Sequence, residues 1–199
     1  MSTLIETIVC FVIAATMQNL VLTTGMGTSA MLKIIRRPRQ VLLFGGLLLG
    51  FTVVTAALFY PLDMLLPDTS RVAQLLRPVI VVALAALQYI AVTLIASRWF
   101  GAWHRRVRHL LPIAAFNSLI IGVTLLFNYQ VQLSFFPAIG LAAGGAVGFL
   151  FLSAITAEGF ARVDNPDTPA AFRGLPAALV YLGLLALALM GFAPIYNFA

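Results

Sequence analysis

Six long apolar stretches divide this chain, and they limit its possible folds more than any other feature. They run over Leu4–Met26, Val41–Tyr60, Ala73–Ala96, Leu110–Phe127, Phe135–Ala157 and Leu175–Ala193. A helix needs about 20 apolar residues to cross the roughly 30 Å of hydrocarbon in a bilayer. Only 9% of the 199 residues are charged, whereas a soluble domain has about a quarter. The sequence therefore predicts an all-α integral membrane protein with six transmembrane helices and no extramembrane domain.

The basic residues alternate between the segments that connect these stretches. Ten lie in the first, third and fifth connections: Lys33, Arg36, Arg37, Arg39, Arg98, Arg105, Arg106, Arg108, Arg162 and Arg173. Only Arg71 and Arg77 lie in the second connection or next to it. Lysine and arginine are enriched in cytoplasmic loops. We therefore expect a multi-pass protein of a bacterial-type inner (cytoplasmic) membrane with both termini outside, and no nucleic acid as a partner.

The two halves of the chain share a pattern at an offset of 98 residues. Asn19, Gly46, Gly50 and Pro78 match Asn117, Gly144, Gly148 and Pro176 in this order. Each half, about 1–97 and 98–199, holds three predicted spans, and an odd number of spans makes the halves insert in opposite senses. The pattern predicts two inverted three-helix repeats within a single membrane domain, as in many transport proteins.

The first and fourth spans contain residues that soften a helix. Asn19 precedes Gly25 and Gly27 in the first span, and Asn117 precedes Gly122 in the fourth. Interrupted helices at matching places in two halves indicate a site near the bilayer midplane. The same glycines and asparagines are also typical of close helix packing and interhelical hydrogen bonds. Both interpretations stay open at this point.

Residues for enzymatic chemistry are missing from the predicted spans. The acidic residues are Glu6, Asp63, Asp68, Glu158, Asp164 and Asp167, and none lies at the centre of a span. Intramembrane proton or sodium relays normally use such a carboxylate. The sequence contains no nucleophile–base pair, phosphate-binding loop or Cys/His cluster, so we expect no catalytic residue and no metal site.

Four segments resemble the RnfA/NqrE family, which comprises the A subunit of the Rnf ion-translocating ferredoxin:NAD oxidoreductase and the E subunit of the sodium-translocating NADH:quinone reductase. They are QNLVL (Gln18–Leu22), LLPIAAFNSLIIGVTLL (Leu110–Leu126), GGAVGFLFL (Gly144–Leu152) and TPAAFRGLPAALVYLGLLALALMGF (Thr168–Phe192). The resemblance covers nearly the whole chain. It implies six helices as an inverted repeat, and as a partner an inverted paralogous subunit (RnfE- or NqrD-like).

The resemblance also implies a [2Fe-2S] cluster, held by one cysteine in each interrupted span and two from the paralogous partner. Here Ser118 occupies the second cysteine position, and Ser29 occupies the first in an ungapped alignment, or Gly27 after a short gap. Iron–sulfur clusters are held by cysteine thiolates. The remaining Cys10 matches neither position. We therefore expect no cluster with standard ligation. Three explanations stay open: a diverged paralogue, a relative that lost electron transfer but kept the scaffold, or an engineered variant.

Three functions remain from the sequence. The first is a membrane subunit of an Rnf/Nqr-like ion-translocating electron-transport complex, without an electron-transfer role based on standard cluster ligation. The second is a stand-alone or homodimeric transporter with its site at Asn19, Gly25, Gly27, Asn117 and Gly122. The third is a purely structural subunit.

Overall fold

The computed structural model describes residues 2–16, 19–34, 38–67, 71–126, 133–163, 169 and 173–190. Within these ranges all regular elements are α-helices. They are α1 (Ser2–Ala15), α2 (Leu20–Thr24), α3 (Thr28–Ile34), α4 (Pro38–Asp63), α5 (Arg71–Trp99), α6 (Gly101–Val107), α7 (Leu111–Ala115), α8 (Ser118–Leu126), α9 (Phe135–Val163) and α10 (Leu175–Met190).

Three of these helices, α4, α5 and α9, are long and apolar enough to cross a membrane. Shorter apolar helical segments cover Thr3–Ala15, Leu111–Leu126 and Leu175–Ala188. In the described ranges the all-helical fold that the sequence predicts is therefore confirmed, and the apolar helices are consistent with a membrane protein. The first and fourth predicted spans are each divided into short helices, because the chain leaves the helical conformation after Ala15, at Gly25–Gly27 and at Phe116–Asn117.

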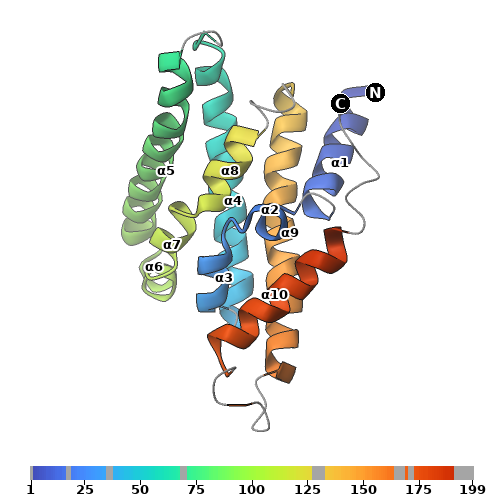
Figure 1. The fold of residues 1–199 in the computed structure, drawn as a ribbon. Coiled ribbons are helices and arrows are strands. Elements are labelled where there is room, and N and C mark those ends of the chain that lie inside the picture. The colour runs from blue at the N-terminus through green and yellow to red at the C-terminus, as the bar shows by residue number, and fades with distance from the viewer. Residues whose placement is uncertain are drawn as a thin grey trace.

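Helix α9 is the most enclosed of the three long helices, and α1 packs along it (Figure 1). Gly140, Gly144 and Gly148 of α9 face the carbonyl groups of Thr7, Phe11 and Ala15, so the two helices run in the same direction. Small residues at four-residue spacing allow two membrane helices to approach this closely. Helix α5 lies at the edge of the bundle, and only 22% of its most apolar 18-residue stretch is buried.

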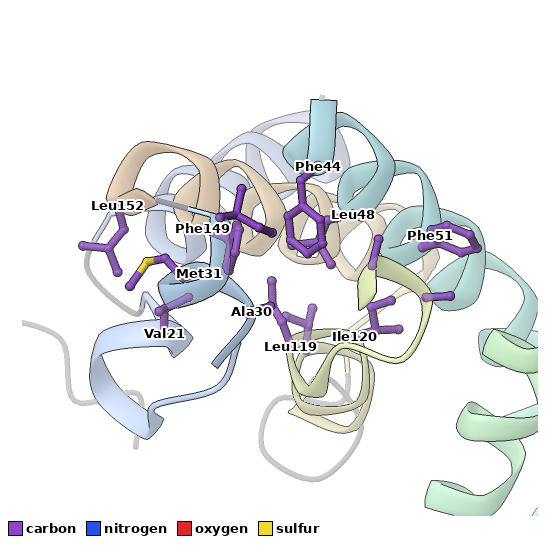
Figure 2. Packing of buried hydrophobic residues seen from close by; sticks show 14 of the residues in the cluster. Val21, Ala30, Met31, Phe44, Leu48, Phe51, Leu119, Ile120, Phe149 and Leu152 are labelled. Carbon is purple, nitrogen blue, oxygen red and sulfur yellow. The ribbon is translucent and has the colours of Figure 1, made fainter. Parts of the chain in front are cut away.

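The hydrophobic core lies where the short helices meet the long ones. Figure 2 shows side chains from α2, α3, α4, α8 and α9 pointing toward one another. Phe44 of α4 and Phe149 of α9 are almost fully buried, and their ring centroids are 5.6 Å apart. Met31 and Leu119 add buried side chains from α3 and α8. This packing fixes the interrupted segments against the rigid helices.

Several helices continue beyond the predicted apolar stretches into segments that the sequence predicts as connections. Helix α4 continues to Asp63, α5 to Trp99 and α9 to Val163. The basic segment after α5 contains a further helix, α6. Helices satisfy their backbone hydrogen bonds internally, so they can continue beyond the apolar stretch that marks the bilayer. Predicted connections at 35–37, 68–70, 127–132 and 164–168, and the predicted helix end at 191–193, lie outside the described residues.

Candidate functional site

The two interrupted segments lie side by side about halfway along the long helices (Figure 1). The first consists of α2 and α3 with a turn between them, and the second consists of α7 and α8. Helix α2 contacts both α8 and α9, which places the first interruption against the second half of the chain. We call the meeting point of the turn Gly25–Gly27 with the start of α8 the junction.

Helices α2 and α8 begin in the same way, with an asparagine that caps the helix. Oδ1 of Asn19 accepts a hydrogen bond from the Val21 N–H (3.1 Å), and Oδ1 of Asn117 accepts one from the Leu119 N–H (3.0 Å). Such caps satisfy backbone donors that have no partner within the helix. Both asparagines are buried. Their shared role explains why an amide side chain occurs at these two places in an apolar sequence.

The side-chain nitrogen, Nδ2, distinguishes the two capping asparagines. Nδ2 of Asn19 donates to the carbonyl oxygen of Gly148 in α9 (2.9 Å), which ties the first interrupted segment to the central helix. Nδ2 of Asn117 is buried and has no hydrogen-bond partner among the described residues. The pair therefore makes the same cap but different tertiary contacts.

Glycine is required in the turn between α2 and α3. Gly25 has φ +72° and Gly27 has φ +82°, in the left-handed region that residues with a Cβ rarely adopt. The carbonyl of Gly25 accepts the Thr28 N–H (3.3 Å) at the start of α3. The sequence prediction that these glycines break the first span therefore has a conformational cause.

The turn meets α8 through a direct hydrogen bond. The backbone N–H of Gly27 donates to Oγ of Ser118 (2.9 Å). A Cβ on Gly27 would lie 3.2 Å from Oδ1 of Asn117 and 3.1 Å from the ring of Phe149, so a side chain there would be crowded. Ser29 instead lies on the exposed side of α3. The structure thus brings Gly27, Asn117 and Ser118 together, and Ser29 is not part of this contact.

Gly122 belongs to the same region for a different reason. The thioether of Met26 packs directly against Gly122, in space that any larger residue at position 122 would occupy. Sequence reasoning identified Gly122 but missed Met26 and Phe149. Both are ordinary apolar residues in the sequence. The one available signal was that Met26 is a bulky residue between two glycines of a predicted break.

Two further polar contacts were missed because each joins residues from different helices. Nε of Arg77 in α5 bonds Oδ1 of Asp63 in α4 (2.7 Å), and the arginine is 3% exposed. Oγ1 of Thr55 donates to Oε1 of Gln88 (3.2 Å), whose Nε2 is buried and has no partner in the described chain. The available signal for the ion pair was an acidic residue at the end of one helix and a basic residue two turns into the next.

The junction offers hydroxyl, carboxamide and backbone groups. Ser118 Oγ already accepts a hydrogen bond, and Gly27 has no side chain. Cys10 is half-buried on α1, a different helix from those that form the junction. Within the described ranges, no group of three His, Cys, Asp or Glu side chains could hold a metal ion. The groups described at the junction can donate and accept hydrogen bonds.

We expect Asn19→Ala to lower the free energy of unfolding more than Asn117→Ala. Both lose a cap, typically about 1 kcal/mol. Asn19→Ala also removes the hydrogen bond that Nδ2 donates to the Gly148 carbonyl, which adds about 1 kcal/mol. Unfolding followed by circular dichroism in detergent measures both variants. Equal losses, or a larger loss for Asn117→Ala, would contradict the different roles of the two amides.

Comparison with known proteins identifies the family. Residues 7–196 match the family model described as "Rnf-Nqr subunit, membrane protein". The chain is 30% identical over 180 residues to a protein of Syntrophotalea carbinolica, covering 90% of this chain and 92% of the relative. It is 34% identical over 112 residues to one of Aromatoleum aromaticum, covering 56% of each chain. Both relatives are named as the A subunit of an ion-translocating oxidoreductase complex. Because the match extends over nearly its whole length, this chain belongs to the Rnf-Nqr family of membrane subunits.

Proposed function

We propose that this chain works as a membrane subunit of a redox-driven, ion-translocating electron-transport complex. The observation that carries the proposal is the similarity, over nearly the full length, to a protein named as the A subunit of an ion-translocating oxidoreductase complex. The fold suits such a role, because apolar helices hold a hydrogen-bonded junction about halfway along their length.

The proposal includes six spans arranged as two inverted repeats, with halves at about 1–97 and 98–199. The helix bounds support it, since an offset of 98 carries Pro38–Asp63 of α4 to 136–161, close to Phe135–Val163 of α9. The matching caps of Asn19 and Asn117 have the same offset. Both termini would face the outside of a bacterial inner membrane. The basic ends of α3, α5 and α9 lie at the opposite end of the bundle from the start of α1, as positive-inside orientation requires (Figure 1).

The groups at the junction do not fit a thiolate-ligated [2Fe-2S] cluster. The family position on α8 holds a hydroxyl that accepts the Gly27 N–H, and the position in the turn has no side chain if it is Gly27. Were the position Ser29, it would offer a hydroxyl in place of a cysteine thiolate. We therefore assign this chain a scaffold and access-path role, with no cluster ligand of its own.

The partner in this proposal is an inverted paralogous membrane subunit that covers the junction. Gly25, Ser29 and Ser118 are exposed at the level where the helices break. Exposed backbone and hydroxyl groups at membrane depth are tolerated only against protein or a water-filled cavity. A stand-alone or homodimeric transporter is the competing function, since its site would use the same break.

Mild solubilisation of the tagged chain from its native membrane, followed by identification of co-purifying proteins, tests this function. We expect other membrane and redox-cofactor subunits of an oxidoreductase in stable proportion. Recovery of the chain alone, or only with copies of itself, would favour the transporter.

Iron and acid-labile sulfide in the purified complex test the cofactor assignment. Ser118→Ala should leave the iron content and the electron paramagnetic resonance spectrum unchanged, because Ser118 is not a ligand in this proposal. Loss of about one cluster in Ser118→Ala, with the subunits still assembled, would refute it. Ser118→Thr, which keeps the hydroxyl, is the matched control.

A further inference from the structure

A compact group of aromatic and basic side chains surrounds the end of α5. Trp99, Phe100 and Trp103 are 79%, 61% and 39% exposed. The four arginines of the same segment are all exposed: Arg98, Arg105, Arg106 and Arg108. We call these seven residues the α6 patch. It lies at one end of the bundle, where α6 folds back against α5 (Figure 1).

The patch is held in place by the inner side of α6. Val107 is fully buried and His104 is half-buried, so this side of the short helix faces the protein. Trp103 and Arg106, three residues apart, are neighbours on the helix surface, and both are exposed. Arg105 is exposed beside them on the same short helix.

The arginines of the patch have no acidic partner within the described part of the chain, in contrast to Arg77 and Arg162, which are paired with carboxylates. Guanidinium groups bind phosphate oxygens in bidentate fashion. Exposed tryptophans at the end of a membrane helix are typical of the interface between acyl chains and headgroups. A phosphate group attached to acyl chains, as in a phospholipid, would satisfy both the arginines and the aromatic residues of the patch.

We infer that the α6 patch binds an anionic phospholipid, with its headgroup phosphate at Arg105 and Arg106 and its acyl chains against Trp99 and Trp103. An acidic protein partner would satisfy the arginines but not three exposed aromatic side chains at the end of a span. Basic clusters beside membrane helices attract anionic lipid headgroups. The inference concerns lipid binding by this chain and does not depend on its place in a complex.

The chain has two tryptophans and both lie in the patch, so their fluorescence reports on it directly. The full chain is reconstituted in phosphatidylcholine vesicles that contain a small fraction of brominated phosphatidylglycerol, which quenches nearby tryptophan. We expect stronger quenching than by the same fraction of brominated phosphatidylcholine. Arg105→Gln/Arg106→Gln should weaken this preference by about 25-fold, because each arginine contributes a factor of about five.

The matched control is Arg71→Gln/Arg162→Gln, which removes two exposed arginines outside the patch. It should keep the preference for the anionic lipid. Equal quenching by the two brominated lipids, or equal losses in the two double variants, would overturn the inference. Arg98→Gln/Arg108→Gln repeats the comparison if the first variant fails to reconstitute, and a preference unchanged in it would count against the patch.

Discussion

Gly144→Ala is expected to lower the free energy of unfolding by roughly 1–3 kcal/mol, the cost typical of overpacking a tight interface. A Cβ at position 144 would overlap the carbonyl group of Phe11 in α1. Backbone cannot rotate away as a flexible side chain can, so α1 must move off α9. We expect a lower midpoint in thermal unfolding and faster proteolysis within α1.

Gly46→Ala is the control for this prediction, because position 46 matches position 144 at the 98-residue offset. Gly46 is exposed, and a Cβ there would meet nothing within 4 Å. Alanine is a better helix former than glycine by about 1 kcal/mol. This variant should unfold at the same or a higher temperature. If both variants lose stability equally, the loss does not come from the contact between α1 and α9.

Asp63→Asn should destabilise the protein by about 3 kcal/mol, in the range found when one partner of a buried ion pair is removed. The side chain of Arg77 is 4% exposed and that of Asp63 is 16% exposed. Asparagine has nearly the same shape as aspartate but leaves the buried guanidinium without this counter-charge. Chemical unfolding of the purified chain in detergent measures the loss.

The exposed pair Glu158–Arg162 provides the matched comparison, with side chains 73% and 79% exposed at 3.3 Å. Glu158→Gln should change stability by less than about 0.5 kcal/mol, as for most surface pairs. The double variant Asp63→Asn/Arg77→Gln should recover part of the loss, because no unpaired charge stays buried. A loss in Asp63→Asn no larger than that in Glu158→Gln would show that burial does not strengthen the pair.

The site residues were predictable from the sequence to the extent that their roles are local. Asn19 and Asn117 stand where helices begin, and a side-chain oxygen that caps a helix acts within two or three residues. Gly25 and Gly27 adopt positive φ, which glycine can do because it has no Cβ. These features need no knowledge of distant residues.

The contact partners were not predictable in the same way. Alignment with the family leaves the first cysteine position at Ser29 or, after a short gap, at Gly27; in the structure the Gly27 N–H donates to Ser118 Oγ. Between the two turn glycines, Met26 packs against Gly122 of α8. The register of a turn against a distant helix depends on side-chain packing, which a linear pattern does not contain.

By itself, the sequence determined that this is a helical membrane protein and which asparagines and glycines could interrupt two of its apolar segments, because hydropathy, capping and glycine conformation are properties of short stretches. Tertiary structure alone decided that α1 covers the glycines of α9 while the matching glycine Gly46 of α4 stays open, and that Arg77 pairs with Asp63. These outcomes depend on how helices translate and rotate against one another, and that is fixed by the fit of side chains from distant parts of the chain.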